Sequence, residues 1–173
     1  MSEIKNYDRA AHKYYMSQNI TGLPITSWDL FGPYFDTLCK NYNDLVAIRH
    51  LASENRWSYS SPIEENLIQD EQIIVITDAK LNIVHATNNI SGMNGYTPQE
   101  ILGKSPKMFQ GEKTCRETQK HISKAIKESR PFEATVVNYR KDGSIYNCWI
   151  KAEPIFNEKG KVVNFIAYEK EVA

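Results

Sequence analysis

The sequence predicts an α+β fold: a five-stranded antiparallel sheet with short helices on one face, preceded by a helical N-terminal extension. Residues 71–173 contain five short runs rich in β-branched and aromatic residues, and turn signals separate these runs. A helix-forming stretch lies between the second and third runs. Short turns join the last three runs, so those strands are expected to be antiparallel neighbours with the helices on one face. Such an arrangement favours a small-molecule pocket between sheet and helices.

Each strand is predicted from a local pattern. The first is the run IIVIT, which ends at a turn over Asp78–Lys80. Lys141–Ser144 and Asn157–Gly160 carry the glycine-containing turn signals of hairpins. The strands are expected at residues 73–77, 83–86, 132–139, 145–156 and 162–172.

The expected helices lie between the second and third strands. Frequent Asn, Gly and Pro over residues 88–98 leave room only for short helices. Thr97 and Glu100 have the spacing of a capping box. Thr114–Glu128 is expected to form a longer helix with Ile122, Ala125 and Ile126 on its inner face.

Residues 1–70 are rich in helix formers and form the predicted extension, and residues 71–173 form the predicted main domain. Ser27 is a suitable N-cap, although Gly32-Pro33 places the start of the regular helix near Pro33. Two interpretations of its apolar stripe stay open. The helix packs on the outer face of its own sheet, or residues 27–56 and that sheet face form a homodimer. The stripe comprises Phe31, Phe35, Leu38, Tyr42, Leu45 and Ala52.

The totals exclude several classes of protein. Lys plus Arg equals Asp plus Glu, at 21 each, so we expect neither nucleic acid nor a membrane surface as partner. Three widely spaced cysteines without a CxxC pattern predict reduced thiols and no metal site. No signal peptide or transmembrane run is evident, which predicts a soluble cytoplasmic protein. Met1 favours a natural N-terminus, but a stand-alone protein and an excised sensor fragment both remain open.

A run of motifs in matching order resembles the PAS domain family. Asn94–Lys104 reads NGYTPQEILGK, followed by RPF at Arg130–Phe132, NYRKDGS at Asn138–Ser144 and FIAYEKEV at Phe165–Val172. These pieces together span about residues 72–172. The resemblance implies the PAS fold and a sensory or interaction role. No catalytic motif accompanies it, so a non-enzymatic function is expected.

Within this family the chain is most similar to the flavin-binding LOV subfamily, whose motif is GRNCRFLQG. The same positions here, Gly103–Gly111, read GKSPKMFQG. By this resemblance the photoreactive cysteine falls on Pro106, which has no thiol to bond a flavin. The phosphate-binding arginine falls on Lys107 and a second family arginine on Ser123. A lysine holds phosphate as a point charge without bidentate geometry.

The resemblance also implies candidate flavin contacts. The family glutamine falls on Gln110, and the two asparagines that read the polar edge of the flavin fall on Asn138 and Asn147. Carboxamides suit that edge because they both donate and accept hydrogen bonds. The switch glutamine of the last strand falls on Glu169. An ionised glutamate accepts only, so Glu169 would need a proton to imitate a glutamine.

Alternation along residues 145–156 gives the orientation expected for the neighbouring side chains. With Asn147 facing the pocket, Trp149 and Lys151 face it too, and Cys148 points to the opposite face. A buried Lys151 needs a partner, for which Glu169 is the candidate. These departures from the LOV pattern indicate a changed ligand or no ligand.

The sequence therefore predicts a signalling module that binds a small ligand or a protein partner and relays its state through the N-terminal helix and dimerisation. The alternatives are a flavin-binding redox or light sensor that forms no adduct, and a ligand-free interaction module whose pocket is filled by Trp149 and its neighbours. A haem ligand is not favoured: His121 lies in the helix concerned but about one turn away from the family's ligand position, near Thr118. Cys115, at the start of that helix, is expected to be an inert thiol although a helix N-terminus lowers thiol pKa values.

Overall fold

The computed structural model describes residues 27–59, 63–68 and 72–173. The chain divides into two compact units, Met1–Cys39 and Lys40–Ala173. The second unit therefore contains residues 40–70 together with the whole sheet. The division predicted at residue 70 stays a prediction.

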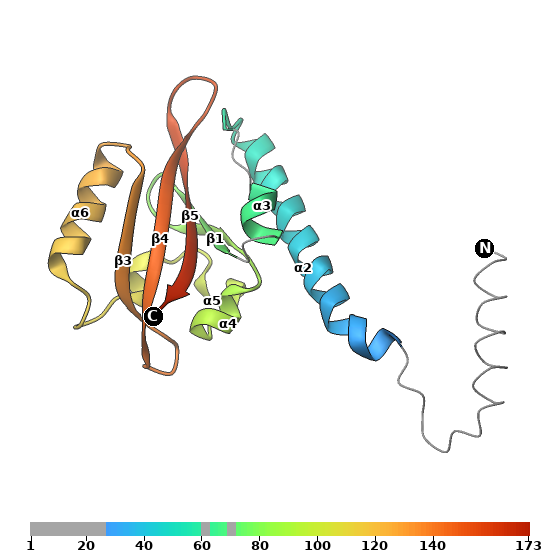
Figure 1. Ribbon diagram of the computed structural model, residues 1–173. Coiled ribbons are helices and arrows are strands. Elements are labelled where there is room, and N and C mark those ends of the chain that lie inside the picture. The colour runs from blue at the N-terminus through green and yellow to red at the C-terminus, as the bar shows by residue number, and fades with distance from the viewer. Residues whose placement is uncertain (1–26, 60–62, 69–71) are drawn as a thin grey trace, which may run out of the picture. The chain divides into compact units, whose positions relative to one another are not determined.

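The sheet has five antiparallel strands in the order β2-β1-β5-β4-β3 (Figure 1). The expected α+β architecture and the expected strand positions are confirmed. Strand β5 lies at the centre, between β1 and β4. The strands are β1 (Ile73–Asp78), β2 (Ile83–Ala86), β3 (Phe132–Tyr139), β4 (Ile145–Phe156) and β5 (Val162–Val172).

Short helices cover one face of this sheet, as expected. They are α4 (Ile90–Asn94), α5 (Pro98–Ile101), the 3₁₀ helix η1 (Pro106–Phe109) and α6 (Arg116–Lys127). The capping box predicted at Thr97 and Glu100 is present at the start of α5. We call the apolar cluster beneath these helices the helix-side core. Its members include Ile73, Val75, Ile83, Ile90, Met93, Ile101, Phe109, Tyr146 and Cys148.

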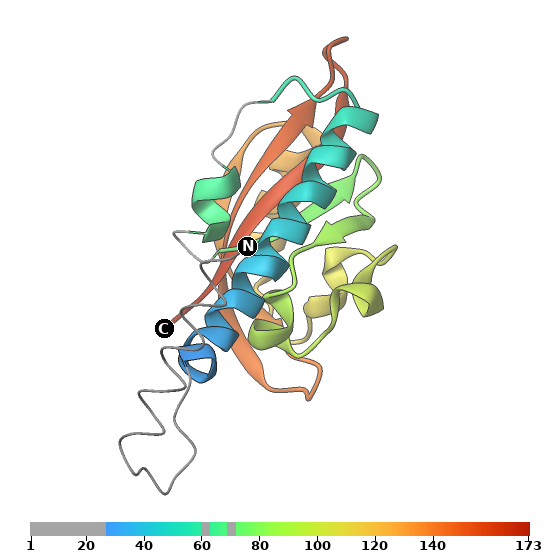
Figure 2. The same cartoon turned by 90° about the vertical axis from the view of Figure 1, so that its right-hand side faces the viewer.

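The opposite face of the sheet is partly covered by helices α2 (Ser27–Glu54) and α3 (Ile63–Ile68), as Figure 2 shows for the stretch from Lys40 onward. Apolar side chains of these helices and of the sheet form a second cluster, which we call the outer core. Within the described residues, this cluster is consistent with the expected packing of the extension on the outer face of the sheet. Helix α2 begins at Ser27 and not near Pro33, so the predicted start was too late. The outer core contains Leu45, Ile48, Leu67, Ile74, Ile76, Ile155, Ile166 and Tyr168.

The core-facing side of α2 is rotated from the predicted stripe. Leu45 and Ile48 are buried, but Tyr42 is 66% exposed. The sequence pattern missed Ile48 because the stripe was counted from aromatic residues earlier in the helix. The predicted positions Phe31, Phe35 and Leu38 have side chains outside the described residues.

A buried polar contact fastens α2 to the loop after β2. Asp44 of α2 accepts hydrogen bonds from the backbone N–H of Asn88 at 2.8 Å and from its Nδ2 at 3.0 Å. His85 Nε2 lies 3.7 Å from Asp44 Oδ1. Burial raises the pKa of Asp44 against the effect of Asn88, and burial lowers the pKa of His85 against the attraction of Asp44. Burial thus disfavours the charged form of both side chains.

Candidate functional site: a buried polar cluster and a basic groove

Alternation along β4 is opposite to the one predicted from the sequence. Tyr146 and Cys148 are buried in the helix-side core, whereas Asn147 is exposed on the other face. Side chains of a strand alternate between the two faces of the sheet. Aligning β4 with the family motif one residue out of register therefore assigns every side chain to the wrong face. The expected orientations of Asn147 and Cys148 were therefore both wrong.

Trp149 and Lys151 likewise lie on the outer face. Trp149 Nε1 donates a hydrogen bond to Glu133 Oε1 at 2.8 Å, and Lys170 Nζ lies 5.0 Å from the Trp149 ring centroid. Lys151 Nζ lies 3.9 Å from Glu153 Oε1, with a side chain that is 52% exposed. Lys151 thus needs no buried partner, and its predicted pairing with Glu169 is wrong. The pocket filling predicted for Trp149 is wrong for the same reason.

Glu169 lies on the helix-side face of the central strand β5. It pairs with Ile73 on β1 and with Ile150 on β4, and only 6% of the residue is exposed. The Cys148 thiol donates a weak hydrogen bond to Glu169 Oε2 at 3.7 Å. Burial raises the pKa of Glu169 from 4.5 to about 7, although the Cys148 contact opposes this. Burial and the neighbouring carboxyl raise the pKa of Cys148.

Three more buried polar groups lie in this interior. Asn94 Nδ2, Asn138 Oδ1 and Tyr146 Oη are buried and make no hydrogen bond among the described residues. Burial first, then Cys148 and Glu169, raise the pKa of Tyr146, and the nearby Asn138 and Asn94 oppose this. Buried polar groups without partners are uncommon and costly in folded proteins. We call Asn94, Asn138, Tyr146, Cys148 and Glu169 the buried polar cluster.

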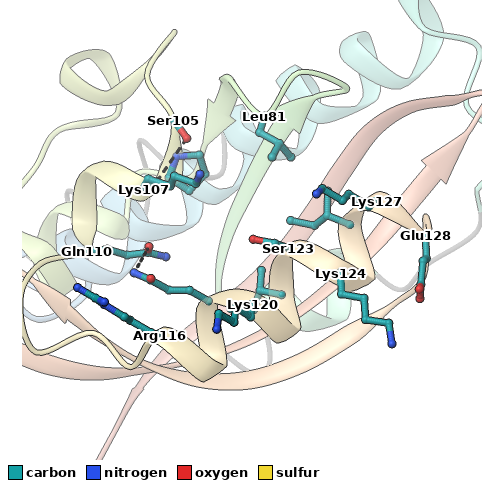
Figure 3. A pocket seen from close by; sticks show the side chains of 14 residues that line it. Leu81, Ser105, Lys107, Gln110, Arg116, Lys120, Ser123, Lys124, Lys127 and Glu128 are labelled. Atoms are coloured by element: carbon teal, nitrogen blue, oxygen red, sulfur yellow. Dashed lines mark hydrogen bonds between the residues drawn. The ribbon is translucent and has the colours of Figure 1, made fainter.

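A separate groove of about 830 Å³ opens between η1 and α6 (Figure 3). Its walls carry cations from two elements: Lys107 from η1, and Arg116 and Lys120 from α6. The lining also includes Ser105, Ser123, Lys124, Lys127 and Glu128. We call this the basic groove. It contains the expected Lys107 and the serine that takes the place of the second family arginine.

Gln110 lies where the groove meets the interior. Its Oε1 accepts a hydrogen bond from Gln119 Nε2 at 3.0 Å, which joins the end of η1 to α6. The preceding residue, Phe109, is buried in the helix-side core. The predicted site residues thus divide into three groups: Asn138 and Glu169 inside, Gln110 and Lys107 at the groove, and Asn147, Trp149 and Lys151 on the far face.

Sequence reasoning missed Tyr146, Cys148 and Asn94 as interior residues. The signal was available in the pairing of β3 with β4, where Val136 lies opposite Cys148 and Asn138 opposite Tyr146. Counting outward from the hairpin at Lys141–Ser144 places Asn138 and Cys148 on the same face.

Two other residues considered from the sequence, Cys115 and His121, lie on the surface. Cys115 is exposed, and hydrogen bonds from the N–H and hydroxyl of Thr118, then from Glu117, lower its pKa. His121 is exposed on α6. Within the described part of the chain, no three metal-ligating side chains lie together. None of the described helices has the length and apolarity needed to cross a bilayer.

The fold and the enclosed polar cluster define the class of the protein: an α+β domain with an antiparallel sheet, short helices on one face and polar side chains enclosed between them. The PAS domain family model matches residues 71–172. The chain therefore belongs to the PAS domain family. Its similarity to LOV proteins and LOV structures confirms the LOV-like resemblance.

Several relatives show this similarity. The chain is 36% identical to the Arabidopsis thaliana protein TWIN LOV 1 over 115 residues, covering 64% of this chain and 29% of that protein. It is 25% identical to the nitrogen fixation regulatory protein of Klebsiella oxytoca over 100 residues, covering 58% of this chain and 20% of that protein. The chain thus spans less than a third of these curated relatives.

Solved structures of LOV and PAS domains are similar in fold to this chain. The dark structure of the blue-light photoreceptor Aureochrome1 LOV superposes with a TM-score of 0.61 and 27% identity, covering 67% of this chain and 86% of that one. The PAS domain from the fruit-fly ELK potassium channel superposes with a TM-score of 0.57 and 25% identity, covering 64% and 94%. PAS and LOV domains are generally sensory modules that do not catalyse reactions, so the relatives suggest a signalling sensor module.

Proposed function

We propose that this protein is a non-enzymatic sensor that reads a small ligand at the buried polar cluster and relays its state to helix α2. The observation that carries this proposal is the position of Glu169. Its carboxyl is buried on the central strand, and among the described residues no cation contributes to its pKa shift. Such a group is costly to maintain for packing alone. Its cost favours a role in sensing.

Strand β5 supplies the relay. Glu169 faces the helix-side core, and the preceding residue, Tyr168, faces the outer core beside Leu45 and Ile48 of α2. Because neighbouring residues of a strand point to opposite faces, a shift of β5 at Glu169 also moves Tyr168. A ligand then changes how α2 docks only to the extent that it binds two arrangements of β5 differently.

A flavin is the candidate ligand that the interior favours by its polar groups. The unpartnered atoms of Asn94, Asn138 and Tyr146 fit the donor and acceptor edge of a heteroaromatic ring. Bound flavin would supply light absorption and reversible electron transfer. Asn138 would hold its edge, Gln110 and protonated Glu169 would donate or accept beside it, and Lys107 would hold a phosphate. With Pro106 in place of the photoreactive cysteine, we propose that no adduct forms there.

Dimerisation is the second part of the proposed relay. Tyr42 and Val46 are 66% and 47% exposed on the side of α2 that faces away from the outer core. Trp149 lies on the outer sheet face, where its hydrogen bond to Glu133 is exposed to solvent. Homodimer contacts through residues 27–56 and this sheet face would place the relay helix directly at a partner copy.

The first test is an absorbance spectrum of freshly purified protein from about 300 to 700 nm, with mass spectrometry of any molecule released on denaturation. A banded absorption at about 450 nm that bleaches reversibly with reductant would support a flavin sensor. A colourless released molecule would support another ligand. A protein with neither, and with unchanged hydrogen exchange in α2 after the Glu169→Gln substitution, would contradict the sensor and favour a ligand-free interaction module.

A further inference from the structure

We propose that Asp44 and His85 form an acid-sensitive contact, through which mild acidification loosens the docking of α2 on the outer face of the sheet. The part of α2 concerned runs from Lys40 to Glu54, within the second compact unit. No ligand at the buried polar cluster takes part, so this response is an input to α2 beyond the proposed function.

His85 lies between the sheet and α2 with a ring nitrogen that has no partner. It pairs with Ile76 of β1, whose side chain belongs to the outer core, so His85 points to the same face. Its side chain is 17% exposed. The buried Nε2 makes no hydrogen bond among the described residues and lies 3.7 Å from Asp44 Oδ1, beyond hydrogen-bond distance. A proton added there would lose its hydration without gaining a bond.

The Asp44 carboxylate joins α2 to the sheet through Asn88 and not through His85. Both of its oxygens already accept hydrogen bonds from Asn88, at 2.8 Å from the backbone N–H and at 3.0 Å from Nδ2. Attraction from the carboxylate favours a proton on His85, but burial has the larger effect. The pKa of His85 in the docked state is therefore lowered from 6.5.

The elements around this pair bring no further charge to it. The pKa of His85 responds to no charged group except Asp44, and that of Asp44 to none except His85. Strand β1 presents Ile76 and helix α3 presents Leu67 to the same outer core. The other described charged side chains of α2 and α3 are exposed: Asp36, Lys40, Arg49, His50, Glu54 and Glu65.

The lowered pKa of His85 determines the direction of the response. Undocking of α2 exposes His85 to water, where it titrates near its ordinary value of 6.5. Just below that pH, the undocked state binds a proton that the docked state does not. Docking is therefore strongest above about pH 6.5 and weakens as the pH falls. Burial of Asp44 acts in the opposite direction, but it raises a pKa that starts from 3.8, well below the histidine range.

The other end of α2 is fastened by bonds that acid does not affect. Trp57 Nε1 donates to Asn164 Oδ1 at 2.8 Å, and the Ser58 N–H donates to the Phe156 carbonyl at 2.8 Å. Neither bond includes a group that titrates near neutral pH. Acidification should therefore loosen the helix first around Asp44, while the segment at Trp57 stays attached to β4 and β5.

Hydrogen exchange of the chain of residues 1–173, corrected for the intrinsic exchange rate at each pH, tests this. Between about pH 7.5 and about pH 5.5, amide protection over residues 40–48 should fall by about threefold or more. Protection over residues 57–58 should change by less than about twofold. His85→Gln should remove the response, because a carboxamide does not gain this proton. The matched control His50→Gln removes an exposed histidine of the same helix and should leave the response unchanged.

A proton titration of the His85 ring by nuclear magnetic resonance gives a second readout that needs no variant. A pKa below 6.5 in the folded chain is expected. A pKa above 6.5, or protection over residues 40–48 that stays constant or rises on acidification, would overturn the proposal. An equal loss of protection in the His85→Gln variant would also overturn it. The raised pKa of Glu169 stabilises the fold at acidic pH, so it cannot produce the expected loss.

Discussion

At the scale of single residues, Glu169 is a carboxyl that the fold buries among apolar side chains. By polarity alone, the run FIAYEKEV does not distinguish Glu169 from the exposed Lys170 and Glu171 that follow it, and only the resemblance to LOV domains singled it out. In the fold its carboxyl is enclosed, with the Cys148 thiol at 3.7 Å as its hydrogen-bond donor. An ionised carboxylate there has lost the water that would hydrate it and has only a weak thiol donor in exchange, so the protonated form is favoured.

This environment predicts a dependence of stability on pH. The folded pKa of Glu169 is raised from 4.5 to about 7, so the folded state holds this proton over a range in which the unfolded state has lost it. The contribution to stability is fully present below about pH 4.5 and is lost as pH rises towards 7 and beyond. The loss is roughly 3 kcal/mol by about pH 8, at about 1.4 kcal/mol per pH unit.

The substitution Glu169→Gln should remove this dependence, because a carboxamide does not titrate. Urea unfolding at about pH 5 and pH 8 should show a smaller difference for the variant than for the unsubstituted chain, with the variant more stable at pH 8 by up to roughly 3 kcal/mol. Glu171→Gln is the matched control, since Glu171 is exposed two residues further along β5. Equal pH dependence in the unsubstituted chain and the Glu169→Gln variant would mean that Glu169 ionises normally in the fold.

The candidate site was predictable from the sequence only in part, and the reason lies in β4. The resemblance to LOV domains identified Asn138 and Glu169, both of which the structure places in the interior. It misplaced Asn147, Trp149 and Lys151, because one residue of error in register moves a side chain through the sheet. The groove depends on residues of α6 and η1 that only the folded chain brings together.

At the scale of elements, the strands and turns were predictable because their signals are local. Alternating β-branched residues and glycine-containing turns need no tertiary information. The face of α2 was less predictable, because an amphipathic helix can rotate until its best-fitting side chains meet the sheet. Here Ile48 has 1% exposure and Tyr42 has 66%, although tyrosine was counted in the apolar stripe.

The docking of α2 on the outer core predicts unequal effects of two neighbouring substitutions. Ile48→Ala removes a buried side chain that packs among Ile74, Ile166 and Tyr168, and should lower the free energy of unfolding by roughly 2–4 kcal/mol. Val46→Ala lies on the exposed side of the same helix and should change it by less than about 0.5 kcal/mol. Chemical denaturation checks both variants. Similar small effects would show that α2 contributes little to the fold.

At the scale of the whole molecule, the sheet separates two cores and belongs to both. The helix-side core contains the buried polar cluster, and the outer core joins β1, β4 and β5 to α2 and α3. Strand β5 contributes Glu169 to one side and Ile166 and Tyr168 to the other. The region matched by the family model, residues 71–172, therefore does not include α2 and α3, the helices that partly cover the outer face of its sheet.

This arrangement predicts that residues 40–70 are required for a well-behaved fold. A chain shortened to residues 40–173 retains both cores and should remain folded, because these residues form one compact unit. A chain shortened to residues 72–173 uncovers Ile74, Ile155 and Ile166 on the outer face, each worth about 1.5–3 kcal/mol when buried. An apolar face of that size favours self-association. Light scattering and thermal unfolding should therefore show a stable particle of defined mass for 40–173, and aggregation or a markedly lower melting temperature for 72–173. Equal behaviour of the two chains would mean that the sheet is stable without its N-terminal cover, and would leave α2 free to act as a separate relay helix.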